Sequence, residues 1–250
     1  MKTRIKASFN KAWKTYDDYC GVQKSICEKA IELLLIQGDR YPVVADFACG
    51  TGLSTQCLVR DINVEKIIAI DFCENLLEIA RAKNSDTKAE FLLADFDDRL
   101  FPDQYLDLIF CNMGLQWSIA LKKTLALFHA YLQNSGVLVF SMPLDNTFPE
   151  LHSRYKNSFH TVNKVISFLD ECQYHVELFR EEVLVDHFST ALDALRSIKS
   201  VGANCGLDKT GPVTHKITKN NISELFVNPK MVSLTYHVGI FVAKKSGVKK

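Results

Sequence analysis

Short apolar runs alternate with helical patterns through the first 150 residues of this chain. The apolar runs, expected as strands, are residues 43–47, 66–70, 90–93, 106–111 and 136–141, and the helical patterns are 53–60, 74–83 and 119–132. Each run is apolar over nearly its whole length, so we expect these strands to be buried on both faces. Strands joined in this way form a doubly wound α/β sheet, and right-handed crossovers bring their carboxyl ends to one edge.

Composition narrows the functions that such a sheet can serve. The chain has 250 residues, and its 30 basic and 29 acidic side chains leave a net charge of +1, unlike the strongly basic domains that bind nucleic acid. No apolar run approaches the length of about 20 residues that a membrane span needs. The eight cysteines lack metal-ligand spacing, so we expect reduced thiols, no metal site and a cytoplasmic protein.

An acid and a glycine-rich turn end the first apolar run. The chain continues from Asp46 to Gly52 as Asp-Phe-Ala-Cys-Gly-Thr-Gly. Glycines at Gly50 and Gly52 let the backbone approach a ligand closely, although a tight strand-to-helix turn without a ligand uses the same residues. A dinucleotide site needs a third glycine beside the pyrophosphate, and Asp46 suits a cationic ligand better than a phosphate.

Two more acids, Asp71 and Asp95, follow the second and third runs. The carboxylate of Asp71 can accept both hydroxyls of a ribose, and Asp95, followed by Phe96, suits the amino group and the face of an adenine. Each acid alone is commonly a surface carboxylate, but together the three line one sheet edge. They describe an adenosine that carries a positive charge and no phosphate, and S-adenosylmethionine fits this description.

At these residues the chain resembles the class I S-adenosylmethionine-dependent methyltransferases. It departs from their pattern at Ala48, where a glycine is usual, and we expect only a slightly tighter loop there. The resemblance implies cofactor-binding roles for Gln23, Asp46, Ala48, Gly50, Gly52, Asp71, Phe72, Asp95, Phe96 and Asn112. Asn112 would flank the sulfonium, and Gln23 would belong to a lid over the cofactor.

The expected architecture is a Rossmann-like sheet, mostly parallel with an antiparallel last strand, plus a small cap. A single domain suits the length, because single cores stop growing at about 250–300 residues. We expect an N-terminal helical lid (1–40), a cofactor-binding core (41–148), a cap or insertion (149–180) and a C-terminal completion of the sheet (181–250).

Three sequence segments outside these motifs are relevant to the identity of the methyl acceptor. They are the aromatic stretch Phe9–Tyr19, the phrase Cys111–Ser118 around Leu-Gln-Trp, and Leu195–Ala203 with the sequence LRSIKSVGA. They resemble the malonyl-[acyl-carrier protein] O-methyltransferases of biotin synthesis. The His-Val-Asn motif of that family is only partly present here, at residues 160–163. The resemblance implies methyl transfer to the free carboxylate of a malonyl thioester, on an acyl carrier protein or coenzyme A, which primes pimeloyl thioester synthesis.

Five residues are candidates for contact with the acceptor. Tyr16 would close the lid, and Gln116 and Trp117 would face the acceptor pocket. Arg196 and Lys199 lie three apart on one expected helix and would bind the thioester, the carboxylate or the carrier. Two alternatives stay open: Trp117 as a core residue, and the two cations as a solvated helix face.

The expected chemistry needs few catalytic groups. A carboxylate is already ionised at neutral pH, so it requires no general base, and no nucleophile–base pair stands out. Basic residues before Asp17 would attract an acidic carrier protein, although such an arm is also commonly just solvated. Methyl transfer to another small carboxylic acid or to a quinone, and a methyltransferase-like assembly factor without catalysis, remain open.

Overall fold

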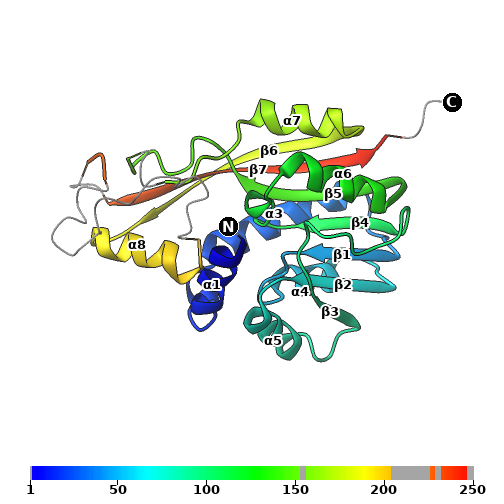
Figure 1. Ribbon diagram of the computed structural model, residues 1–250, viewed down its shortest axis with the longest axis horizontal. Helices are drawn as coiled ribbons and strands as arrows, with labels where there is room; N and C mark the ends of the chain where they lie inside the picture. Colours follow the sequence, from blue (N-terminus) through cyan, green and yellow to red (C-terminus); the bar gives the residue numbers. More distant parts are fainter. Residues whose placement is uncertain (1, 153–155, 204–225, 229–231, 247–250) are drawn as a thin grey trace.

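A seven-stranded sheet crosses the whole molecule (Figure 1). The computed structural model describes residues 2–152, 156–203, 226–228 and 232–246. The strands are β1 (Val43–Phe47), β2 (Lys66–Asp71), β3 (Ala89–Leu93), β4 (Leu106–Cys111), β5 (Leu132–Pro143), β6 (Tyr174–His187) and β7 (Ser233–Lys245). Their order is β3-β2-β1-β4-β5-β7-β6, with β1 to β5 parallel and β7 antiparallel to β5 and β6. The expected doubly wound, mostly parallel sheet with an antiparallel last strand is confirmed.

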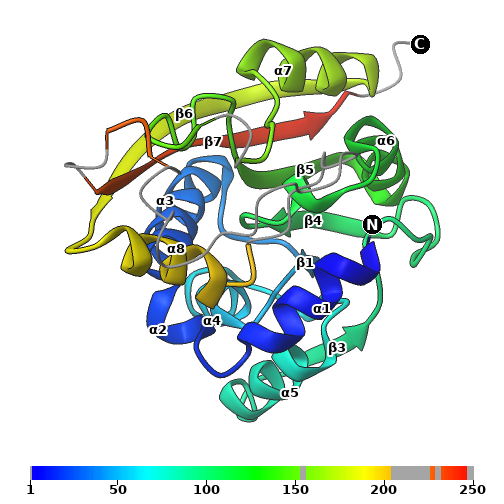
Figure 2. The same ribbon diagram turned by 60° about the vertical axis from the view of Figure 1, so that its left-hand side comes forward.

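Helices cover both faces of this sheet. They are α1 (Lys2–Ala12), α2 (Tyr16–Tyr19), α3 (Gly21–Gln37), α4 (Leu53–Asp61), α5 (Glu74–Lys83), α6 (Leu121–Tyr131), α7 (Val162–Glu171) and α8 (Ala191–Ser200), with a 3₁₀ turn η1 (Leu115–Trp117). Apolar side chains of α3 and α4 form one core with one face of the sheet, and those of α6 and α7 form the second core on the opposite face. Helices α1, α2 and α8 gather at one end of the sheet (Figure 2).

The central strands are buried on both faces, as their continuous apolar sequence predicts. In β1, Val44, Ala45, Asp46 and Phe47 are all fully buried. Phe47 stacks on Phe128 of α6, with ring centroids 4.4 Å apart, while Val44 belongs to the core under α3 and α4. Because alternate residues enter different cores, a polar residue in β1 has no solvent face, and Asp46 must find its partners inside the protein.

The segment expected as a cap has a different boundary. Residues 174–180 are the first half of β6, so the C-terminal part of the sheet, expected from residue 181, begins seven residues earlier. Helix α7 precedes it and packs on α6 and β6, where its buried Val165 and Leu169 join the core. The side-chain oxygen of Thr161 caps α7 by accepting a hydrogen bond from the Lys164 N–H.

Candidate active site at the carboxyl end of the sheet

The turn after β1 changes the direction of the chain through three residues with positive φ. These are Ala48 (φ 56°), Gly50 (φ 57°) and Gly52 (φ 83°), and α4 begins at the next residue. A side chain at Gly52 would place its Cβ 2.5 Å from Nδ2 of Asn84, so both its dihedral and its surroundings require glycine. Ala48, the departure noted in the sequence, adopts the same left-handed conformation as the glycines.

Asp46 anchors the start of α4 beneath this turn. Ser54 Oγ lies 3.0 and 2.8 Å from its two carboxylate oxygens, and Thr55 Oγ1 donates to Oδ2 at 2.6 Å. Burial raises the pKa of Asp46 to about 7, opposed by the hydrogen bonds from Thr55 and Ser54. The carboxylate of Asp46, for which the resemblance implies a cofactor-binding role, therefore lies inside the protein, below the turn.

Asp71 links the ends of two neighbouring strands. It is the last residue of β2, and its carboxylate accepts hydrogen bonds from the Gly50 N–H at 3.0 Å and the Cys73 N–H at 2.8 Å. Burial raises its pKa to about 6, partly offset by these backbone donors. Each carboxylate oxygen has a second lone pair, so this geometry leaves acceptor capacity for two hydroxyl groups.

The ammonium of Lys2 lies among the side chains of Asp95, Phe96 and Phe72. Lys2 Nζ is 2.7 Å from Asp95 Oδ1 and 2.9 Å from Asp97 Oδ2. The same nitrogen is 4.2 Å from the Phe96 ring centroid and 5.8 Å from that of Phe72. Two aromatic rings and a carboxylate thus surround one position, an environment that also suits a flat group with an amino donor.

Helix α2 packs over the glycine turn. The Tyr16 hydroxyl lies 3.7 Å from where a Cβ on Gly50 would be, and burial raises the pKa of Tyr16 well above its usual value. Asp17 accepts a hydrogen bond from Thr51 Oγ1 at 2.8 Å and forms an ion pair with Lys83 at 2.6 Å. These contacts hold the expected lid segment on the turn and on α5.

Asn112 is held rigidly just after β4. Its Nδ2 donates to the main-chain oxygen of Gln23 at 2.9 Å, and its Oδ1 accepts from Ser141 Oγ at 2.7 Å. Asn112 therefore ties α3 to β4 and β5, and Gln23 participates through its carbonyl. Both residues lie beside the cavity described next, which Gln23 also lines.

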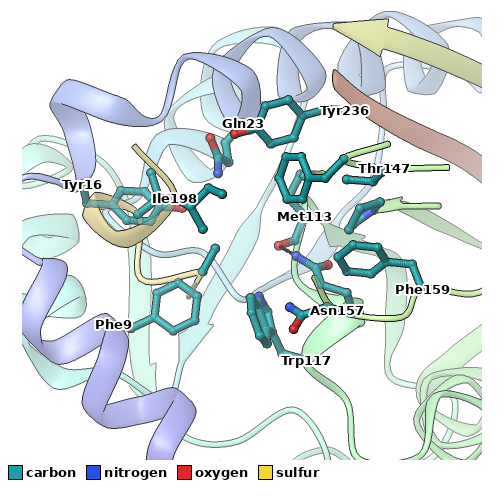
Figure 3. Close-up of a pocket in the computed structure, with 15 residues that line it drawn as sticks. Phe9, Tyr16, Gln23, Met113, Trp117, Thr147, Asn157, Phe159, Ile198 and Tyr236 are labelled. Atoms are coloured by element: carbon teal, nitrogen blue, oxygen red, sulfur yellow. Dashed lines mark hydrogen bonds between the residues drawn. The ribbon is translucent and has the colours of Figure 1, made fainter. Parts of the chain in front are cut away.

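An aromatic cavity lies next to Asn112 and the turn, at the carboxyl end of the parallel strands (Figure 3). Its volume is about 60 Å³. Polar groups come from Gln23, Gln116, Thr147 and Asn157, whereas most of the wall is apolar. The lining residues are Phe9, Tyr16, Gln23, Met113, Gln116, Trp117, Pro143, Thr147, Phe148, Asn157, Phe159, Ile198, Val201, Ala203 and Tyr236.

Gln116 and Trp117 approach this cavity from η1. Gln116 Nε2 donates to the Met113 main-chain oxygen at 2.6 Å, which leaves its buried Oε1 without a hydrogen-bond partner among the described residues. Trp117 packs edge-to-face on Phe9 of α1 with ring centroids 5.6 Å apart. Trp117 therefore belongs both to the core and to the cavity wall. The two interpretations of this residue, core and pocket, are thus compatible.

Arg196 and Lys199 lie outside the cavity. Arg196 is exposed on α8 and forms an ion pair with Asp193 at 3.1 Å. Lys199 lines a separate groove between α1 and α8. The cavity side of α8 instead presents Ile198 and Val201, because residues on adjacent positions of a helix point to different sides.

Sequence reasoning missed several of the residues that line the cavity. Tyr236 enters from β7 and points toward Gln23, and Phe159 and Asn157 close the opposite side (Figure 3). Nothing in the local sequence distinguishes Tyr236 from other aromatic strand residues. Within the described ranges no group of His, Cys, Asp or Glu forms a metal site, and no helix has the length and apolarity to span a membrane.

The residues at this sheet edge fit S-adenosylmethionine. Gly50 and Gly52 form a close-approach turn, Asp71 keeps acceptor capacity for the ribose, and the point now taken by Lys2 has the surroundings of an adenine site. The strand order 3-2-1-4-5-7-6 and this edge define a class I S-adenosylmethionine-dependent methyltransferase. Residues 44–136 match the methyltransferase-domain family.

Comparison of the whole chain narrows the class further. A protein from Coxiella burnetii, malonyl-[acyl-carrier protein] O-methyltransferase 2, is 42% identical over 98% of this chain and 97% of its own length. A protein of the same activity name from Acetivibrio thermocellus is 27% identical over 98% of this chain and 94% of its own length. The chain belongs to the malonyl-[acyl-carrier protein] O-methyltransferase family.

Solved structures agree at the level of the fold. A structure from Bacillus halodurans described as a methyltransferase has a TM-score of 0.64 and 14% identity, and the match covers 88% of this chain and 100% of that one. A Burkholderia thailandensis N1-methyltransferase with bound S-adenosylhomocysteine has a TM-score of 0.60 and 15% identity, covering 96% of this chain and 88% of its own.

Proposed function

We propose that this enzyme transfers the methyl group of S-adenosylmethionine to the free carboxylate of a malonyl thioester carried by an acyl carrier protein. The observation that carries the proposal is the aromatic cavity beside Asn112 and the glycine turn, whose described polar groups are neutral amides and hydroxyls. The Coxiella burnetii relative, similar over nearly its whole length, supports the choice of acceptor. The product would prime pimeloyl thioester synthesis for biotin.

The reaction requires positioning more than acid–base chemistry. The cofactor supplies a methyl group on a positively charged sulfur. One carboxylate oxygen forms a bond to the methyl carbon as the carbon–sulfur bond breaks, and the electron pair stays on sulfur, so no proton moves. A carboxylate with a pKa near ~4 is already ionised at neutral pH, and correct alignment of this kind can supply roughly 7–11 kcal/mol of the barrier.

The cavity suits a carboxylate that must stay reactive. Amide groups at Gln23, Gln116 and Asn157 can orient an acceptor without pairing its charge with a cation that would reduce its nucleophilicity. The hydroxyl of Tyr16, whose pKa burial raises, remains a neutral donor.

The proposed cofactor contacts follow the same edge. We assign Gly50, Gly52 and, through the turn, Ala48 and Asp46 to the methionine end, and Asp71 to the ribose. Asp95, Phe72 and Phe96 would hold the adenine after the adenine has displaced the ammonium of Lys2 from this position. Gln23 and Asn112 would border the sulfonium.

The described cysteines are all free thiols, which supports the cytoplasm as the location of the protein.

The test is incubation with malonyl-carrier protein and isotopically labelled S-adenosylmethionine, followed by mass measurement of the acyl group. A gain of one labelled methyl group is expected on the malonyl thioester, and none on acetyl-carrier protein, which has no free carboxylate. Succinyl-carrier protein tests the length of the acceptor pocket. Methylation of free dicarboxylic acids at the same rate as the carrier-bound malonyl group would contradict the proposal.

A further inference from the structure

A basic groove between α1 and α8 has no role in the chemistry described so far. It has a volume of about 590 Å³ and is lined by Arg4, Ala7, Ser8, Lys11, Ala12, Thr15, Lys199 and Ser200. Three of these side chains are cationic, three carry hydroxyls, and none of the described lining residues is acidic. The groove therefore carries a local positive charge on a protein whose net charge is only +1.

Two of the cations are available to an external anion. Lys11 and Lys199 are exposed, and neither forms an ion pair with any residue in the described part of the chain. By contrast Lys2, on another face of the same helix, is held by Asp95 and Asp97, and Arg196, on another face of α8, is held by Asp193. Of these four cations, Lys2 and Arg196 are thus paired within the protein, whereas Lys11 and Lys199 face one groove.

The groove and the aromatic cavity share a wall. Along α1, Ser8 lines the groove and the next residue, Phe9, lines the cavity. At the end of α8, Lys199 and Ser200 line the groove, whereas Ile198 and the next residue after the helix, Val201, line the cavity. Thr15 Oγ1 donates to the Ser200 main-chain oxygen at 3.1 Å, which joins the two segments. A ligand in the groove therefore lies one layer of side chains from the acceptor cavity.

We propose that this groove binds the phosphate of the phosphopantetheine arm of an acyl carrier protein, with Lys11 and Lys199 as its principal contacts. The inference rests on the proposed function and extends it, because it assigns a docking surface to the carrier. Lysine ammonium groups bind phosphate oxygens through charge-assisted hydrogen bonds, and the hydroxyls of the groove add neutral donors. The acidic surface of a carrier protein complements the exposed cations around the phosphate.

The experiment uses the double variant Lys11→Glu/Lys199→Glu and three acceptors of decreasing charge: malonyl-carrier protein, malonyl-phosphopantetheine and malonyl-pantetheine. The KM is expected to rise about tenfold for the carrier protein, about threefold for the phosphate-bearing arm, and less than twofold for malonyl-pantetheine. Added salt should raise the KM of the unaltered enzyme for the carrier more steeply than that of the variant.

Lys123→Glu serves as the matched control, because Lys123 is an exposed lysine of α6 that lines neither the groove nor the cavity. Its KM values should match those of the unaltered enzyme. Equal losses on all three acceptors would overturn the proposal, since they would place the two lysines in the cavity chemistry. Malonyl-coenzyme A is measured as a fourth acceptor, and a rise in KM confined to it would assign the groove to a nucleotide phosphate and would equally overturn the proposal.

A binding measurement separates this inference from the proposed function. The carrier protein with its phosphopantetheine arm, but without a malonyl group, is titrated into the enzyme and followed by fluorescence anisotropy. Its dissociation constant is expected to rise about tenfold in the double variant, whether or not malonyl is methylated. Unchanged binding in the variant would refute the docking site even if methyl transfer is observed.

Discussion

At the scale of single residues, the cofactor edge is already occupied by the protein's own side chains. Asp46 is satisfied by Ser54 and Thr55, and Asp95 is satisfied by Lys2. The first arrangement is internal and need not change when a ligand binds. The second lies where the adenine amino group is expected, so the cofactor must compete with an ammonium for the same carboxylate and the same aromatic face.

Replacing Lys2 with methionine should therefore tighten binding of S-adenosylhomocysteine. Ion pairs of this partly exposed kind contribute up to about 1 kcal/mol, so the dissociation constant is expected to fall by about two- to fivefold. Isothermal titration calorimetry without any acceptor measures this directly. Lys6→Met, on an exposed lysine of the same helix, is the control and should have no effect. An unchanged or raised dissociation constant for Lys2→Met would contradict the competition.

At the scale of elements, α1 connects three parts of the site. Lys2 reaches the adenine corner, Phe9 contacts Trp117 of the aromatic cavity, and Lys11 lines the basic groove. Its contact with the chain after α8 is close, because Gly202 packs directly on Phe9. The position of α1 therefore affects cofactor, acceptor and carrier together, although each is bound mainly by other elements.

Gly202→Ala should loosen α1 from the rest of the protein. Gly202 has φ +72°, and an added Cβ would lie 2.7 Å from Cδ1 and 2.9 Å from Cα of Phe9. We expect a loss of about 1–3 kcal/mol in the free energy of unfolding and faster hydrogen exchange in residues 2–12. Gly21→Ala is the matched control, because nothing lies within 4 Å of its Cβ position, and its stability should be unchanged or slightly higher. Equal exchange rates of residues 2–12 in both variants would show that Gly202 does not position α1.

At the scale of the whole molecule, a seven-stranded sheet with two cores buries a pair of carboxylates near its centre. Asp46 and Asp71 lie near the ends of adjacent strands, and burial raises their pKa values to about 7 and about 6. The charge of Asp71 further raises the pKa of Asp46. Stability of the cofactor-free protein is therefore linked to protonation of its active-site edge.

The sign of this linkage follows from the raised pKa. Between about pH 4 and pH 7 the folded protein keeps a proton on Asp46 that the unfolded chain releases, so this stabilisation is lost as the pH rises through the folded pKa of about 7. Tm without cofactor should therefore depend less on pH between 5.5 and 8 in Asp46→Asn than in the unaltered protein, since asparagine mimics the protonated acid.

Thermal unfolding at constant ionic strength measures this difference. The comparison with Asp46→Asn isolates one carboxyl group from His129 and His160, whose pKa values are lowered by burial and whose effect on stability has the opposite sign. Asp71 keeps part of the pH dependence in the variant. Parallel Tm curves for the two proteins would show that Asp46 has an ordinary pKa in the folded state.

Most of the sheet could be predicted from sequence because its signals are local. The apolar runs of β1, β2 and β4 were expected within a residue of their observed bounds, and α5 over its observed range of Glu74–Lys83. These strands are central and buried on both faces, so the apolar run and the strand coincide. The edge strand β6 alternates exposed and half-buried residues, and only its second half was expected.

Local sequence is enough to predict which residues end the strands and which turn follows β1, because strand burial and glycine turns depend on neighbouring residues. Three placements follow instead from the packing of the folded chain. Lys2 meets Asp95 across 93 positions, and Tyr236 enters the cavity from β7. Lys199 faces a groove, while Arg196 turns to Asp193. Such contacts depend on how distant elements pack, and a local pattern of residue types does not indicate which distant side chains will meet.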